Sequence, residues 1–198
     1  MDEVTVKYWD DQWKRRYHDH RVTTNMQRLD KIVNFLWHQP QWTDVPKLEV
    51  GCGTGIHAAQ VGRLYRGWLD NYLGVDVSGE AVKICNDHGV RAVQDDFLSF
   101  ADQTSERFGL FLFFDVLEHM RCFQYVARAV RDIALPNYEV AGNIPLYRSG
   151  HEGFERNMNI NVLKAFFNGC GLEGQLWHEV YGCHGYPYML FKMGGGVR

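Results

Sequence analysis

The chain has 198 residues, of which 45% are hydrophobic and 14% aromatic, and its formal net charge is −3 at pH 7. This size fits one domain with a substantial core, and the slightly acidic balance excludes a strongly basic nucleic-acid-binding protein. The five cysteines form no C-x-x-C pair, which excludes a zinc ribbon or thioredoxin-type motif. A polar N-terminus and the lack of a run of about 18 apolar residues predict a cytoplasmic protein without membrane contact.

Residues 1–42 are predicted to be helical. An aromatic stripe opens this segment, and apolar side chains then recur at helical spacing over residues 24–39 until Pro40 stops the helix. We interpret residues 1–42 as a helical lid or cap on a core formed by residues 43–198, both within a single domain. The stripe consists of Tyr8, Trp9, Trp13 and Tyr17.

From Lys47 onward, predicted strands and helices alternate. Strands are expected at 47–50, 72–77, 90–94, 110–116, 138–144, 172–180 and 186–193, and helices at 56–65, 79–89, 118–135 and 160–171, with a loop between 94 and 110. The central strands are continuous apolar runs, which is typical of strands covered by helices on both faces. The pattern predicts an α/β fold with a doubly wound, mostly parallel, seven-stranded Rossmann-like sheet.

Three glycines follow the first predicted strand in the stretch KLEVGCGTG, at positions 51, 53 and 55. Glycines permit a tight turn and a close approach of a ligand to the backbone, and the next helix directs its free N–H groups at negative charge. A dinucleotide fingerprint would need a further glycine at position 56, where Ile56 stands. The loop therefore predicts a ligand site of another kind.

Acidic residues end the next two predicted strands. Asp76, followed by Val77, lies about 20 residues beyond the loop, where a carboxylate can accept both hydroxyls of a ribose. Asp95 and Asp96 end the third strand, where an acid can accept from an adenine amino group, and Phe97 can lie against the ring of the base. Together these positions provide for a nucleoside with a charged tail.

The segments LEVGCGTG, GVDVS, DDF and FFDVLEHM resemble, in order and spacing, the consecutive motifs of class I S-adenosylmethionine-dependent methyltransferases, from Lys47 to about Gly142. The resemblance implies S-adenosyl-L-methionine as cofactor, S-adenosyl-L-homocysteine as product, and a sheet that ends in an antiparallel strand, here 186–193. It also implies that the glycines border the methionine tail, that Glu49 lies near its ammonium, and that Asp76 holds the ribose. The cofactor-binding candidates are Glu49, Gly51, Gly53, Gly55, Asp76, Val77, Asp95, Asp96, Phe97 and Asp115.

The stretch DVLEH at the end of the fourth predicted strand supplies the candidates for chemistry. Methyl transfer depends mainly on the alignment of nucleophile, methyl group and sulfur. An oxygen or nitrogen nucleophile can also need a base, and His119, with Glu118 beside it, is the leading candidate. The alternative interpretation is structural, because Asp115 and Glu118 have the spacing of a helix-capping pattern.

A metal-assisted alternative stays open. Asp115, Glu118 and His119, with His151 after the fifth strand, resemble the D/E-x-x-E-H…H pattern of ubiquinone-biosynthesis O-methyltransferases and of small-RNA terminal-ribose 2′-O-methyltransferases. In those families the acids and histidines hold a divalent metal. Here an aspartate stands where those families usually carry glutamate, so no metal ligand is assigned, and His151 is kept as a further catalytic candidate.

The acceptor is expected to be a small molecule methylated on oxygen or nitrogen. Aromatic and imidazole side chains of 144–159 and 178–186 could ring a modest, partly polar acceptor. An RNA acceptor is disfavoured because no basic groove with stacking aromatics is visible in the sequence. A non-catalytic S-adenosylmethionine-binding domain is the remaining alternative, and the oligomeric state is not predicted.

Overall fold

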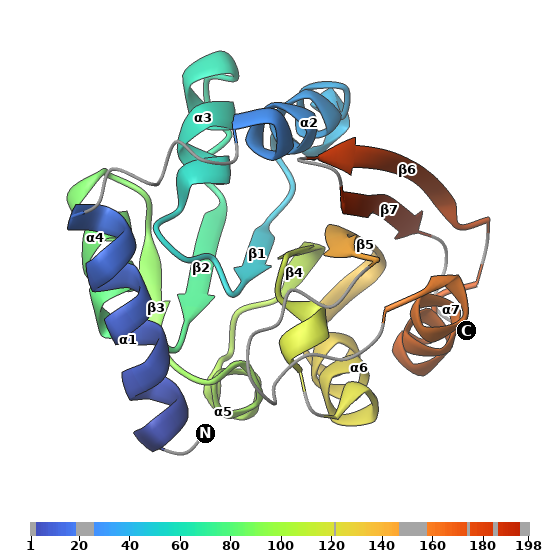
Figure 1. Ribbon diagram of the computed structural model, residues 1–198. Coiled ribbons are helices and arrows are strands. Elements are labelled where there is room, and N and C mark those ends of the chain that lie inside the picture. The colour runs from blue at the N-terminus through green and yellow to red at the C-terminus, as the bar shows by residue number, and fades with distance from the viewer. Residues whose placement is uncertain are drawn as a thin grey trace. The chain divides into compact units, whose positions relative to one another are not determined.

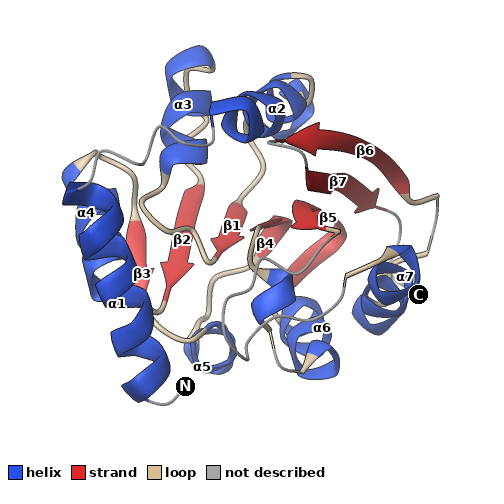
Figure 2. Ribbon diagram, in the orientation of Figure 1, coloured by secondary structure: helices blue, strands red, loops and turns tan. Residues whose placement is uncertain are grey.

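The computed structural model describes residues 3–18, 26–120, 122–146, 158–173, 175–183 and 186–194 (Figure 1). Its seven strands form one mostly parallel sheet with an antiparallel β7, and its helices are distributed along the whole chain (Figure 2). The predicted α/β fold class is confirmed. By its internal contacts the chain divides into two compact units, Met1–Phe97 and Leu98–Arg198.

The first unit is built on three parallel strands in the order β3-β2-β1. Its elements are α1 (Glu3–His18), α2 (Met26–Trp37), the 3₁₀ turn η2 (Pro40–Trp42), β1 (Lys47–Val50), α3 (Ile56–Leu64), β2 (Tyr72–Asp76), α4 (Gly79–Asp87) and β3 (Ala92–Gln94). Every residue of β1 and β2 is buried, as expected for apolar parallel strands that are covered on both faces. Helix α1 packs beside α4, and α2 packs beside α3 (Figure 1).

The second unit has four strands in the order β4-β5-β7-β6. Its elements are α5 (Phe97–Gln103, whose first residue ends the first unit), β4 (Phe108–Phe114), η3 (Leu117–His119), α6 (Phe123–Asp132), β5 (Ala134–Pro145), α7 (Ile160–Cys170), β6 (Trp177–Cys183) and β7 (Tyr186–Gly194). Strand β5 pairs parallel with β4, while β7 pairs antiparallel with both β5 and β6. The antiparallel final strand is therefore present, as the resemblance implied.

The close approach of β4 and β5 explains why residue 142 is a glycine. A methyl group added at Gly142 would lie 2.0 Å from the carbonyl oxygen of Phe113. Because a real Cβ never comes so near a carbonyl oxygen, any larger residue would force the two strands apart. Gly142 thus sets the spacing of the strand end that carries Asn143, a residue of the candidate site.

Three predicted elements were wrong in extent or missing. The predicted helix 118–135 is interrupted, because His119 and Met120 donate their backbone N–H groups three residues back, to Val116 and Leu117, and α6 begins only at Phe123. The predicted loop between 94 and 110 contains the short helix α5. Strand β6 lies several residues later than predicted. Short 3₁₀ and helical turns lack a long apolar period, so the sequence pattern does not reveal them.

None of the helices in the described part of the chain has the length and apolar character needed to cross a membrane.

Candidate functional site

The glycine loop between β1 and α3 has a backbone that only glycine adopts readily. Gly51, Gly53 and Gly55 have φ angles of +68°, +54° and +69°, a left-handed conformation that costs other residues roughly 1–2 kcal/mol each. Gly55 is also the N-cap of α3. A methyl group on Gly55 would lie 2.5 Å from Cys85 Sγ. The loop is therefore fixed by backbone geometry and by the packing beneath it.

Asp76, at the end of β2, holds this loop. Its Oδ2 accepts the Gly53 N–H at 2.8 Å, and its Oδ1 accepts the Ser78 N–H at 2.9 Å. The side chain is buried, and this burial raises the pKa of the Asp76 carboxyl, while the two backbone N–H groups act in the opposite direction. Each carboxylate oxygen can accept more than one hydrogen bond, so the group can brace the loop and still receive two ribose hydroxyls.

Glu49 lies inside β1 and is buried, with 1% of its surface exposed. Its Oε2 accepts from the Tyr72 hydroxyl at 2.8 Å, and its Oε1 lies 3.2 Å from His57 Nδ1 in the first turn of α3. The carboxylate therefore ties β1 to β2 and α3. Its predicted place near a methionine ammonium stays a prediction.

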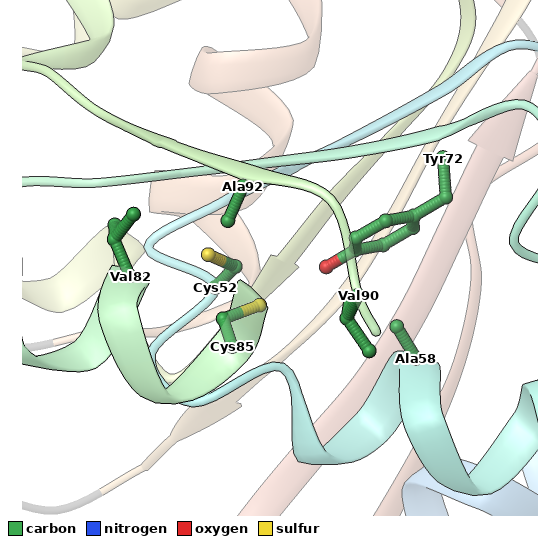
Figure 3. Packing of buried hydrophobic residues seen from close by; sticks show 7 residues of the cluster. All are labelled: Cys52, Ala58, Tyr72, Val82, Cys85, Val90 and Ala92. Carbon is green, nitrogen blue, oxygen red and sulfur yellow. The ribbon is translucent and has the colours of Figure 1, made fainter. Parts of the chain in front are cut away.

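A small buried cluster packs against the glycine loop (Figure 3). Tyr72 directs its hydroxyl toward the side of the cluster that holds the sulfur atoms of Cys52 and Cys85 (Figure 3). A hydrogen bond with Cys85 and burial raise the pKa of the Cys52 thiol well above its usual range. The Cys52 thiol is thus a neutral packing group. The cluster comprises Cys52, Ala58, Tyr72, Val82, Cys85, Val90 and Ala92.

Helix α1 lies against the same loop. A methyl group on Gly53 would stand 2.6 Å from Cζ2 and 2.8 Å from Cη2 of Trp13, so the indole rests directly on this glycine. Asp10 Oδ1 accepts the Ser78 hydroxyl at 2.6 Å and the Glu80 N–H at 3.3 Å. Lys14 Nζ lies 3.3 Å from Glu80 Oε1, between exposed side chains. The N-terminal helix therefore covers the loop and the first turn of α4.

The residues that the sequence predicts to bind the adenine follow β3. Asp95 donates its backbone N–H to the Asp76 carbonyl oxygen at 3.0 Å, which brings the ends of β2 and β3 together. Its carboxylate accepts the Asp96 N–H at 2.8 Å. Val77 accepts from the Gln94 amide at 3.1 Å through its carbonyl oxygen. Phe97 begins α5 and is buried, so most of its ring packs within the protein.

In the second unit, Asp115 follows β4 in a left-handed conformation with φ +52°. Two hydrogen bonds join it to Asn143 of β5. The Asp115 N–H donates to the Asn143 carbonyl oxygen at 3.0 Å, and the Asn143 amide donates to Asp115 Oδ1 at 2.7 Å. Tyr181 of β6 completes the set by donating its hydroxyl to Asn143 Oδ1 at 2.8 Å.

Sequence reasoning missed Asn143, which is fully buried. The available signal was a single amide in the otherwise nonpolar end of β5, residues 141–145. A buried amide needs partners, so an isolated asparagine in such a run indicates a specific hydrogen-bonding task.

Glu118 and His119 lie together in η3. Glu118 is buried, the His119 side chain is 16% exposed, and His119 Nε2 stands 3.9 Å from Glu118 Oε1. The alternative capping interpretation was wrong, because the N-cap residues are Val116 for η3 and Cys122 for α6. A histidine beside a carboxylate has the composition of a general base, and its catalytic role stays a prediction.

The metal alternative gains no support from the described residues, among which no group of three or more histidine, cysteine, aspartate or glutamate side chains could hold a metal ion. His151, the fourth member of the predicted pattern, lies outside the described residues.

Comparison with known proteins identifies the domain. Residues 48–134 match the family model described as a methyltransferase domain. Among curated proteins, none matches this chain. The matched residues include the glycine loop, Asp76, Asp115 and His119.

Solved structures resemble the whole described fold. Magnesium protoporphyrin IX methyltransferase from Synechocystis PCC 6803 with bound S-adenosylhomocysteine is 14% identical, with 96% of this chain and 98% of that chain covered and a TM-score of 0.72. The DhpI complex with S-adenosylhomocysteine is 15% identical over 100% of both chains, with a TM-score of 0.68. An S-adenosylmethionine-dependent methyltransferase from Archaeoglobus fulgidus is 10% identical over 83% of this chain and 92% of that chain, with a TM-score of 0.66. The predicted resemblance is confirmed: residues 48–134 match the methyltransferase-domain family model, and the chain has the fold of solved S-adenosylmethionine-dependent methyltransferases.

Proposed function

We propose that this protein transfers a methyl group from S-adenosyl-L-methionine to an oxygen or nitrogen atom of a small-molecule acceptor. The observation that carries the proposal is the Asp76 carboxylate, which is buried at the end of β2 and hydrogen-bonded to Gly53 of the glycine loop. This arrangement suits a ribose beside a backbone that a ligand can approach closely. The family match supports the proposal, and so does the S-adenosylhomocysteine bound in magnesium protoporphyrin IX methyltransferase and in DhpI.

The donor-binding residues are proposed as follows. Asp76 accepts the ribose hydroxyls, and Gly51, Gly53 and Gly55 border the amino-acid end of the donor. Asp95, Asp96 and Phe97 serve the adenine, with Val77 beside the ribose and Glu49 near the donor ammonium, and Asp115 is retained as a further donor-binding candidate. The bound donor supplies an electrophilic methyl group on a sulfonium.

His119 is proposed as the group that removes a proton from the acceptor. Its imidazole is 16% exposed and lies 3.9 Å from the carboxylate of Glu118, and a carboxylate beside an imidazole stabilises the imidazolium that forms when the proton arrives. Glu118 therefore has a supporting role. His151 is retained as a second catalytic candidate from the sequence pattern.

Helix α1 is proposed as a cap on the donor site. The contacts of Trp13 with Gly53 and of Asp10 with Ser78 place this helix on the residues proposed to hold the donor. With α1 docked, water has reduced access to the loop, and the donor must enter before the helix closes or while it is displaced. We infer that removal of α1 would accelerate donor dissociation.

The acceptor class is tested with labelled donor. The purified protein is incubated with S-adenosyl-L-methionine carrying an isotopic methyl group and with separate small-molecule and RNA fractions of a cell extract, and mass spectrometry identifies the labelled product. Label in a small molecule, lost in His119→Ala, supports the proposal. Label confined to RNA termini would instead support the RNA ribose alternative, and donor binding without any labelled product would support a non-catalytic domain.

A further inference from the structure

Three side chains form a continuous hydrogen-bonded set in the second unit: Tyr181 of β6, Asn143 of β5 and Asp115 in the turn after β4. We propose that Tyr181 and Asn143 are positioning residues that hold the Asp115 carboxylate in the orientation needed for donor binding. This inference rests on the proposed function, because it assumes that Asp115 contributes to the donor site. It assigns a positioning role to Tyr181 of β6, a strand that lies more than sixty residues after Asp115 in the chain.

The direction of each hydrogen bond follows from the chemistry of the groups. An amide oxygen can only accept, so the Tyr181 hydroxyl must be the donor in its 2.8 Å contact with Asn143 Oδ1. On the other side of the amide, the NH₂ group donates to Asp115 Oδ1, 2.7 Å away. If the amide turned over, its oxygen would face the carboxylate and its NH₂ would face the phenol. Because a carboxylate can only accept and a phenol can donate or accept, the Asp115 carboxylate selects this orientation of the amide, and the Tyr181 hydroxyl holds it by donating to the amide oxygen.

The backbone at Asp115 needs this support. Its φ of +52° is a conformation that costs a residue with a side chain free energy unless the surroundings hold it. Asn143 supplies two bonds to this one residue, through its carbonyl oxygen and through its side-chain amide. Loss of the side-chain bond therefore affects both the carboxylate and the turn that presents it.

Tyr181 is itself fixed in place. Its ring stacks on that of Tyr188, with centroids 5.7 Å apart and an interplanar angle of 22°, and only 7% of the residue is exposed. On β7, Tyr188 pairs with Tyr181 on one side and with Pro145 of β5 on the other. A buried, stacked phenol keeps its hydroxyl in one place, so the Asn143 amide has a fixed hydrogen-bond partner.

The test compares two buried tyrosine hydroxyls. Tyr181→Phe removes the donor to Asn143 and keeps the ring, while the matched control Tyr138→Phe removes the hydroxyl that donates to the Cys170 carbonyl oxygen from the same strand as Asn143. Affinity for S-adenosyl-L-methionine is measured by calorimetry, and stability by thermal unfolding. We expect Tyr181→Phe to weaken donor binding about tenfold, equivalent to about 1.4 kcal/mol, and Tyr138→Phe to leave donor affinity within twofold, at about the same loss of stability.

A double-mutant cycle separates positioning from general loosening. If Tyr181 acts through Asp115, then Tyr181→Phe has little further effect on donor affinity in an Asp115→Ala background. Equal losses in both backgrounds, or an unchanged affinity of Tyr181→Phe, would overturn the inference. Should Tyr181→Phe fail to fold, Asn143→Asp keeps the residue size and the acceptor for Tyr181 but places an oxygen opposite Asp115. It is expected to lose at least as much donor affinity, and wild-type affinity in this variant would likewise overturn the inference. A wild-type protein that binds no donor would refute the proposed function itself, a result distinct from all of these.

Discussion

Replacing Gly53 with alanine is expected to create a steric clash between the glycine loop and Trp13 of α1. The new methyl group would stand 2.6 and 2.8 Å from two ring carbons of Trp13, where ordinary contacts lie at 3.4–4 Å. The φ of +54° adds a backbone cost of roughly 1–2 kcal/mol, and overpacking typically adds about 1–3 kcal/mol. The sum is a loss of about 2–5 kcal/mol in the free energy of unfolding, unless α1 undocks and limits the second contribution.

Denaturant unfolding of wild type, Gly53→Ala, Trp13→Ala and the variant with both substitutions measures this. Trp13→Ala should cost stability in the wild type, because the indole packs on the loop. In the Gly53→Ala background it should cost little or be favourable, because it removes the clash. Gly55→Ala is the matched control, with a similar φ of +69° and a methyl group 2.5 Å from Cys85 Sγ in the buried cluster. Trp13→Ala should give it no relief. Equal, additive effects of Trp13→Ala in all backgrounds would refute the proposed contact between α1 and the loop.

Three further outcomes are expected. Asp76→Asn should weaken donor binding at least tenfold and also lower stability, because one of its two backbone N–H donors then faces an NH₂ group; calorimetry showing wild-type affinity would contradict the ribose assignment. His119→Ala should cut turnover about 10²–10⁴-fold with donor affinity nearly unchanged, and a surviving rate in a methyl-transfer assay would make His119 structural. Burial lowers the pKa of Lys47 from 10.5 to about 8, against the opposing carboxylates of Asp44 and Asp70. The unfolded chain therefore binds more protons between these pH values, so the stability of the wild type relative to Lys47→Met should rise by about 3 kcal/mol from pH 8 to 10.5; a flat difference in urea titrations would contradict the lowered pKa.

Local spacing was enough to predict that the glycine loop and Asp76 lie together. The glycine loop and Asp76 lie next to strands that the sequence marks clearly, and the ends of parallel strands meet at one edge, so their proximity follows from the fold class. The structure adds that Asp76 braces the loop through Gly53 and Ser78. These hydrogen bonds involve backbone N–H groups, so no pattern of side chains in the sequence predicts them.

The contacts of Tyr181, Asn143 and Asp115 could not be predicted, because they depend on the pairing register of strands that are far apart in the sequence. Tyr181 reaches Asn143 because β7 lies between β6 and β5 in an antiparallel pairing, which fixes which residues face one another. The left-handed turn at Asp115 also escapes prediction, because aspartate rarely adopts it and no glycine marks the site. The sequence also predicted one long helix where a 3₁₀ turn and α6 stand, because a short 3₁₀ turn has no apolar period of its own.

The docking of α1 was predicted only as a general lid. The amphipathic pattern of the aromatic stripe indicated a helix, but Asp10, which binds Ser78, is not part of that stripe. A polar contact between residues so far apart in the chain depends on how the helix lies on the folded protein. Sequence periodicity predicts which side of a helix is apolar, but it does not predict which residues that helix contacts.

The central claim is that the turn after β1 and the carboxylate at the end of β2 bind a nucleoside sulfonium. Calorimetric titration of the wild-type protein and Asp76→Ala with S-adenosyl-L-methionine, with a nicotinamide dinucleotide as the competing ligand, tests it most directly. We predict saturable binding of the sulfonium compound to the wild type, a loss of at least tenfold in Asp76→Ala, and no heat from the dinucleotide. Binding of the dinucleotide instead, or identical titrations of S-adenosyl-L-methionine into both proteins, would contradict the account.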